Sequence, residues 1–298
     1  MSRRVAIAWG VLALAPVLAF GADQPAAVRK PLAVSGKDAG ASVRRAANAP
    51  LAPAKLSAAE IVARNVAARG GQSAWHAVQT LSWSGRMEAG GNNQRYIRAP
   101  GMPPPPVNET PNAQVQLPFT MDMKRGRKSR LQLVFNGQTA VQVYDGKQGW
   151  KVRPFLNRHQ VESYTADEAR QAADQADIGG LLIEAANAGT RIDVEGLDRL
   201  DGKGAYKLKL TLKSGRVVRE WVDAQSFLEV KMEGTPRRMD GRLRPVAVYM
   251  RDYRNVSGVQ IPYVIETTVQ GVERTEKIVI EKAAVNAPLA DSLFAKPT

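Results

Sequence analysis

The chain has 298 residues, of which 44% are hydrophobic, so it can bury a sizeable core. It contains no cysteine, which excludes disulfide bonds, thiol catalysis and thiolate metal sites. Two histidines, far apart in the sequence, argue against a histidine-based metal site, while one histidine with carboxylates stays open as an alternative. A formal net charge of +14 favours an anionic partner.

The N-terminus has the pattern of a secretory signal peptide. Arg3 and Arg4 precede an apolar run that ends at Phe20, and small residues surround a cleavage position near Gly21. We therefore predict a signal peptide over 1–21 and export to the periplasm of a Gram-negative cell. The alternative is an uncleaved anchor, although Pro16 interrupts the run and a membrane span needs about 20 apolar residues.

Removal of the signal peptide takes away Arg3 and Arg4 and lowers the formal charge from +14 to +12. For an exported protein this charge favours transient contact with an anionic membrane surface over nucleic acid, or it is only a soluble basic surface. Residues 22–56 are rich in alanine and proline and hold no aromatic residue. We predict that they form a flexible tether to one domain over 57–298.

The first residues of this domain carry the signals of two helices. Ser57 and Glu60 have the spacing of a capping box, and an apolar stripe continues to Arg69, where Gly70-Gly71 predicts the helix end. A short helix around 73–78 should then carry Trp75 inward.

Alternating apolar and polar residues predict about ten strands after this helix, separated by glycine-containing turns roughly ten residues apart. The clearest stretch is 205–234, which we expect to form a three-stranded meander with one apolar face. Six prolines lie in a long loop over 90–114, which is either a docking loop or an inert insertion. Four basic residues at 125–130 fall on one hairpin and favour a charged edge that discourages aggregation.

A helical insert over 165–188 interrupts the strands. Thr165 and Glu168 form a second capping box, and a strongly apolar helix follows after Gly180. An apolar helix inside a meander has to lie across the apolar face of the sheet. We therefore expect a lid that is formed by Leu181, Leu182 and Ile183.

The fold class predicted from these elements is mainly β with inserted helices, built on one large curved antiparallel sheet. The residues expected to line its apolar face share one side of their strands: Trp83, Met121, Met123, Leu131, Leu133, Leu208, Leu210, Leu228, Val230, Met232, Ile261 and Ile265. For any one of them, ordinary core packing is the competing interpretation.

Local motifs of catalysis are absent from the sequence. It contains no nucleophile elbow, zinc-protease helix, P-loop or dinucleotide-binding glycine pattern, and no RNA- or DNA-binding signature. We predict no catalytic residues, no cofactor and no nucleic-acid partner, while a catalytic site assembled only in three dimensions stays open.

Several short segments, in this order, resemble the LolA/LolB-like outer-membrane lipoprotein-sorting proteins: Arg69-Gly70-Gly71 with Trp75, residues 144–150, residues 221–228, residues 252–254 with 258–263, and Phe294. The resemblance covers about 57–297. It implies a half-open β-barrel roofed by helices, with a cavity for acyl chains, in a protein that carries lipoproteins or lipids across the periplasm. The chain is longer than the compact carriers, and the polar residues that latch their lid have no match that we can align.

The resemblance implies that the ligand is the acyl chains of a lipoprotein or another lipid, with an inner-membrane transporter and an outer-membrane acceptor as partners. The first hypothesis is therefore a periplasmic carrier or binding protein, a chaperone in outer-membrane biogenesis. The alternative is an envelope-stress or regulatory interaction domain that senses lipids or proteins. An enzyme is the third hypothesis.

Overall fold

The computed structural model describes residues 56–90, 114–154, 157–173, 177–239, 241–272 and 275–298. The predicted signal peptide, the tether as far as residue 55 and the proline-rich loop between 91 and 113 lie outside the described residues. Among the helices that are described, none combines the length and the apolar character needed to cross a membrane.

The described helices are short, and those that follow Ser57, Thr165 and Gly180 begin where the sequence predicts. They are α1 (Ala58–Ala68), α2 (Gln72–Ala77), α3 (Ala166–Ala173), α4 (Leu181–Ala188) and the 3₁₀ turn η2 (Asp291–Phe294). Both predicted capping boxes are confirmed: Ser57 N donates to the Glu60 carboxylate over 2.8 Å, and Thr165 N donates to the Glu168 carboxylate over 2.7 Å. Trp75 is buried, as its helix requires.

All the strands that the structure describes belong to one antiparallel sheet, in the spatial order β6-β5-β4-β3-β2-β1-β13-β12-β11-β10-β9-β8-β7. Their bounds are β1 Thr80–Gly90, β2 Gln114–Lys124, β3 Lys128–Phe135, β4 Gln138–Tyr144, β5 Gly149–Arg153, β6 Arg158–Ser163, β7 Arg191–Leu200, β8 Lys203–Thr211, β9 Val217–Asp223, β10 Glu229–Met239, β11 Arg242–Val256, β12 Val259–Val269 and β13 Glu276–Val285. The sequence predicted about ten strands. It did not predict β6, because the residues of this strand show no apolar alternation.

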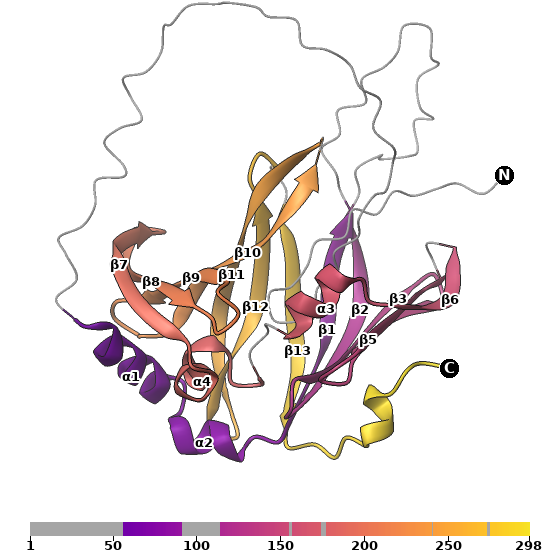
Figure 1. Cartoon of the computed structure of the whole chain (residues 1–298), viewed down its shortest axis with the longest axis horizontal. Helices are drawn as coiled ribbons and strands as arrows, with labels where there is room; N and C mark the ends of the chain where they lie inside the picture. The colour runs from indigo at the N-terminus through magenta and orange to yellow at the C-terminus, as the bar shows by residue number, and fades with distance from the viewer. Residues whose placement is uncertain (1–55, 91–113, 155–156, 174–176, 240, 273–274) are drawn as a thin grey trace, which may run out of the picture.

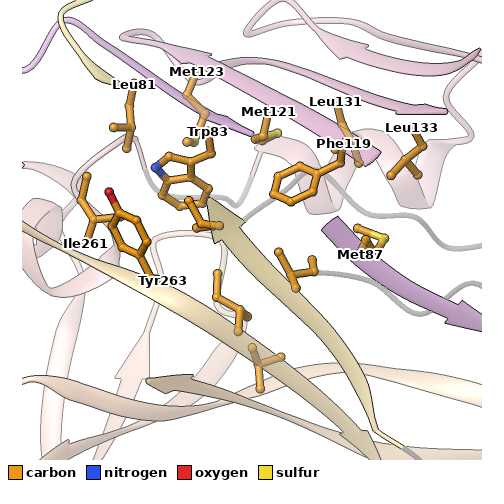
Figure 2. Close-up of a cluster of buried hydrophobic side chains, with 14 of the residues drawn as sticks. Leu81, Trp83, Met87, Phe119, Met121, Met123, Leu131, Leu133, Ile261 and Tyr263 are labelled. Carbon is orange, nitrogen blue, oxygen red and sulfur yellow. The ribbon is translucent and has the colours of Figure 1, made fainter. Parts of the chain in front are cut away.

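The sheet is curved, so that its two halves diverge from β13, and α1, α2 and α4 gather at one end of it (Figure 1). We call the inner face the side of the sheet that carries Trp83, Met121 and Ile261. Side chains of β1 and β2 on this face point toward the side that Ile261 and Tyr263 of β12 occupy (Figure 2). A large antiparallel sheet with one apolar face, as predicted, is therefore confirmed.

The buried apolar side chains of the inner face form two clusters. The larger cluster spans β1, β2, β3, β11, β12 and β13, and includes Trp83, Met121 and Ile265. The smaller cluster lies at the other end of the strand order and consists of Ile61, Leu182, Leu208, Leu210 and Val222. The protein therefore has two apolar centres on one continuous sheet.

The strict alternation predicted along β10 is wrong. The pairing of β10 with β9 shifts register between Glu229 and Lys231, so that Glu229 faces Val222 while Met232 faces Glu220. A bulge of this kind adds a residue and changes which side chains point inward. Glu229 is buried, and Leu228 and Val230 are only partly buried.

The end of α1 is fixed to the sheet by a close backbone contact. Gly70 has φ +111° and sits against the β11–β12 turn, where a Cβ atom on Gly70 would lie 2.2 Å from the carbonyl oxygen of Gly258. Arg69 O accepts a hydrogen bond from Gln260 N over 3.0 Å. Only glycine fits at this contact, since both the backbone angle and the space exclude a side chain.

We predict that Gly70→Ala destabilises the protein by more than about 2 kcal/mol, because it adds a steric clash to the ~1–2 kcal/mol cost of a left-handed alanine. Gly71→Ala is the matched control: Gly71 has φ +91°, but nothing lies within 4 Å of a Cβ atom there. Urea unfolding of both variants measures the difference. Equal losses of unfolding free energy would contradict the close contact with Gly258.

Candidate functional site

Most of the predicted lining residues come together on the inner face. Trp83, Met121, Met123, Leu131, Leu133, Ile261 and Ile265 belong to the larger cluster, and Met232 packs against it. Leu208 and Leu210 belong to the smaller cluster. Leu228 and Val230 lie outside both clusters, because of the register shift in β10.

The predicted lid residues lie where the two clusters meet. Ile183 belongs to the larger cluster and Leu182 to the smaller one, while Leu181 packs against the smaller cluster from a partly buried position. Helix α4 also contacts α1. A single two-turn helix therefore supplies apolar side chains to both centres.

Helix α4 has a few polar contacts with neighbouring segments. Arg125, in the β2–β3 turn, donates to Glu184 of α4 over 3.1 Å and to the backbone oxygen of Trp75 in α2. Its guanidinium also lies 3.8 Å from the carboxylate of Asp177, just before α4. Gln72 Nε2 donates to Ile183 O over 3.3 Å. Arg125 thus joins α2, the segment before α4 and α4 itself to one hairpin.

The interpretation of the basic hairpin as a protective sheet edge is wrong, because β2 and β3 lie inside the strand order. Its basic residues bind neighbouring segments instead. Arg127 donates to Ala173 O at the end of α3, Lys128 pairs with Asp291 over 2.8 Å, and Arg130 donates to Leu293 O over 3.1 Å. The positive charge therefore ties helices to the sheet.

Helix α3 is attached through a buried ion pair. Lys151 of β5 donates to Glu168, and both side chains are almost fully buried. The other oxygen of Glu168 caps α3, so one carboxylate both starts the helix and docks it. Gln171 at the far side of α3 lies 3.5 Å from the hydroxyl of Thr235 in β10.

Sequence reasoning missed a buried polar group between the clusters. Arg69, the residue that ends α1, donates to Glu229 over 2.6 Å and to Gln260 O over 3.1 Å. Its guanidinium stacks over the ring of Trp75, with 4.6 Å to the centroid. The hydroxyl of Tyr253 donates to the backbone oxygen of Glu229 over 2.9 Å.

Glu220 completes this group. It lies on the inner face of β9, opposite Leu208 of β8 and Met232 of β10, and is 4% exposed. Burial raises the pKa of Glu220 to about 8, and the charge of Glu229 adds to the shift while Arg69 opposes it. The side chain is therefore mostly a neutral acid at pH 7. Its signal in the sequence is a glutamate on the inward register between Val218 and Val222.

No group of three or more histidine, aspartate or glutamate side chains within the described ranges is arranged to hold a metal ion. The polar chemistry of the inner face includes the Arg69 group, the Lys151–Glu168 pair and the contacts of Arg125.

Solved structures resemble this architecture. A LolA-superfamily protein of Nitrosomonas europaea aligns with a TM-score of 0.50 and 14% identity over 81% of this chain and 98% of its own. The chain has a LolA-like fold. A domain from Vibrio parahaemolyticus, named for outer membrane lipoprotein sorting, gives a TM-score of 0.50 and 11% identity over 80% of this chain and 95% of its own.

A DUF1329 family protein from Desulfovibrio piger aligns to a similar extent, with a TM-score of 0.50 and 13% identity over 80% of this chain and 96% of its own. No protein-family model and no curated protein sequence matches the chain. At this level of identity the comparison speaks for the LolA-like fold alone.

Two of the segments that carried the resemblance in sequence, 69–75 and 252–263, meet in space at Arg69. Trp75 Nε1 donates to Arg69 O, Gly70 packs on Gly258, and Tyr253 and Glu229 contact the Arg69 side chain or its partner. Segments that are far apart in the chain thus build one corner of the LolA-like fold.

We predict that Glu220 makes stability fall as pH rises from about 4.5 to about 8. Its pKa is raised in the folded chain, so the folded chain binds more protons than the unfolded chain in this window. The contribution is complete below pH 4.5 and is lost by pH 8, with a slope of at most about 1.4 kcal/mol per pH unit. Chemical unfolding of wild type and Glu220→Gln between pH 4 and 9 measures it.

The Glu220→Gln variant removes only this titration, so the difference between the two curves isolates it from the other groups. Parallel curves for the two proteins would mean that Glu220 is ionised in the folded chain at neutral pH.

Proposed function

We propose that this chain is a periplasmic binding or carrier protein that shields acyl chains of a lipoprotein or lipid against its inner face. An inner-membrane transporter would load it and an outer-membrane acceptor would unload it. The observation that carries the proposal is the position of α4. Its Leu182 and Ile183 belong to two different apolar clusters, which supports a role for α4 as a lid over a chain that lies along both.

The small number of polar contacts that hold α4 is consistent with a helix that can move. Beyond its apolar contacts, the helix is tied mainly through Arg125 and Gln72, and Gly180 caps it without a side-chain hydrogen bond. Glycines at both ends, Gly180 with φ +90° and Gly189 with φ +65°, provide hinge positions. The helix can therefore swing as a unit without breaking strand pairing.

The free energy needed to open the lid is similar in size to the free energy gained when an acyl chain is buried. Exposing Leu182 and Ile183 costs about 1.5–3 kcal/mol for each side chain. A buried acyl chain contributes about 0.8 kcal/mol for each methylene, so a chain of moderate length offsets the cost of opening. A lining that includes Met121, Met123 and Met232 adapts to chains of different shape.

The direct test is to isolate the protein from a Gram-negative envelope and to analyse an organic extract by mass spectrometry. We expect acyl lipid in near-stoichiometric amount, and a shift to a higher melting temperature when lipid is added back to delipidated protein. Protein that is lipid-free when isolated, and that binds no acyl probe, would overturn the proposal.

We predict that Arg125→Gln accelerates exchange of a fluorescent fatty acid roughly tenfold, because it removes charged hydrogen bonds that keep α4 closed. Stopped-flow displacement measures the dissociation rate. Arg127→Gln is the matched control: it removes the same charge two residues away, from a contact with α3 instead of α4. Equal rates in the two variants would contradict a role for Arg125 in closing the lid.

A further inference from the structure

The inner face holds several polar atoms that lack partners. Within the part of the chain that the structure describes, Asn65 Oδ1 and Glu229 Oε2 are buried and accept no hydrogen bond. Glu220 is buried beside them, and its carboxyl oxygens take no part in the hydrogen bonds that Asn65, Arg69 and Tyr253 donate. Asn65, Glu220 and Glu229 are each at least 95% buried. Such groups destabilise a fold unless something satisfies them.

These three residues converge at the end of α1. Asn65 Nδ2 donates to Phe227 O, two residues before Glu229, and Arg69 one turn further along α1 pairs with Glu229. Glu220 is electrostatically coupled to both Glu229 and Arg69. The three side chains therefore belong to one polar group between α1 and the strands β9 and β10.

This group lies under the proposed lid. Glu220 is paired across the sheet with Leu208, which shares a cluster with Leu182 of α4. On its other side Glu220 faces Met232, which packs against the larger cluster. A ligand that lies along both clusters beneath α4 has to pass Glu220.

The chemistry of the group favours a ligand that donates hydrogen bonds. Several nearby donors are already engaged: Arg69 with Glu229 and Gln260, Tyr253 with Glu229 O, and Asn65 Nδ2 with Phe227 O. The buried atoms of this group that make no hydrogen bond are oxygen acceptors, Asn65 Oδ1 and Glu229 Oε2. Glu220 is mostly a neutral acid at pH 7, so an ammonium group beside it would favour the ionised form of Glu220 and form an ion pair with it.

We propose that Asn65, Glu220 and Glu229 form a recognition site for a primary ammonium group carried by an amphiphile whose hydrocarbon chain lies under α4. This inference rests on the proposed function, because the chain of the ligand occupies the acyl-binding face. It names the ligand class as amine-bearing lipids. A buried water would satisfy the same oxygens but would give no preference for an amine.

The test is displacement of a fluorescent acyl probe from the mature protein at pH 7 by dodecylamine, dodecanol and dodecanoate, each below its micellar concentration. We expect dodecylamine to displace the probe at about tenfold lower concentration than dodecanoate. In Glu220→Leu the probe still binds, and the three compounds should act within about twofold of one another. Glu220→Gln should lose the advantage of the amine over the alcohol.

Glu281→Gln is the control for overall charge, because Glu281 is an exposed carboxylate of β13 whose side chain is 51% exposed. It should keep the preference for the amine. A melting temperature of Glu220→Leu at or above that of wild type would verify that the variant is folded, since the substitution removes an unsatisfied buried carboxyl group.

Probe binding without a preference for dodecylamine, or a preference that survives in Glu220→Leu, would overturn the ammonium site and leave the acyl-binding proposal standing. A wild-type protein that binds no acyl probe at all would overturn both.

Discussion

The rest of this structure depends on one antiparallel sheet with a single apolar face that has to be buried. The sheet is curved, so that its two halves diverge from β13 (Figure 1), and its inner face has to bury apolar side chains with the help of a few short helices. Burial of apolar area is the dominant favourable term in folding. The two separate clusters are the result, and the junction between them is the part of the core that depends on a small helix.

The contacts of Arg69 fix the end of α1 to the sheet. The residue ends α1, pairs with Glu229, stacks on Trp75 and is bridged to the β11–β12 turn through Gln260. A buried guanidinium is tolerated because its charge is paired and its hydrogen bonds are made. With α1 and α2 anchored there, α4 is left as the element whose position depends on its apolar side chains and on a few polar contacts at Ile183 and Glu184.

The same region carries a conflict between stability and function. A buried Glu220 between Leu208 and Met232 costs free energy that an apolar residue would not. Conflicts of this kind are expected where a protein binds something. The ammonium site that we infer would explain why a carboxyl group interrupts the apolar face directly beneath the helix that we interpret as a lid.

The sequence by itself determined the local elements: the capping boxes at Ser57 and Thr165, helix α4 over 181–188, and most strands, since each is encoded within a few neighbouring residues. It also placed Trp83, Met121 and Ile261 on one face through their period of two.

Only the tertiary structure decided which distant residues meet. Arg69 and Glu229 are 160 positions apart, and Arg125 contacts Glu184 of α4, which is 59 positions further along the chain. The bulge that turns Glu229 inward in place of Leu228 and Val230 depends on pairing with β9, and no periodicity within β10 encodes it. Side-chain contacts across a sheet arise from register and curvature, which are properties of the assembled strands and of no single segment.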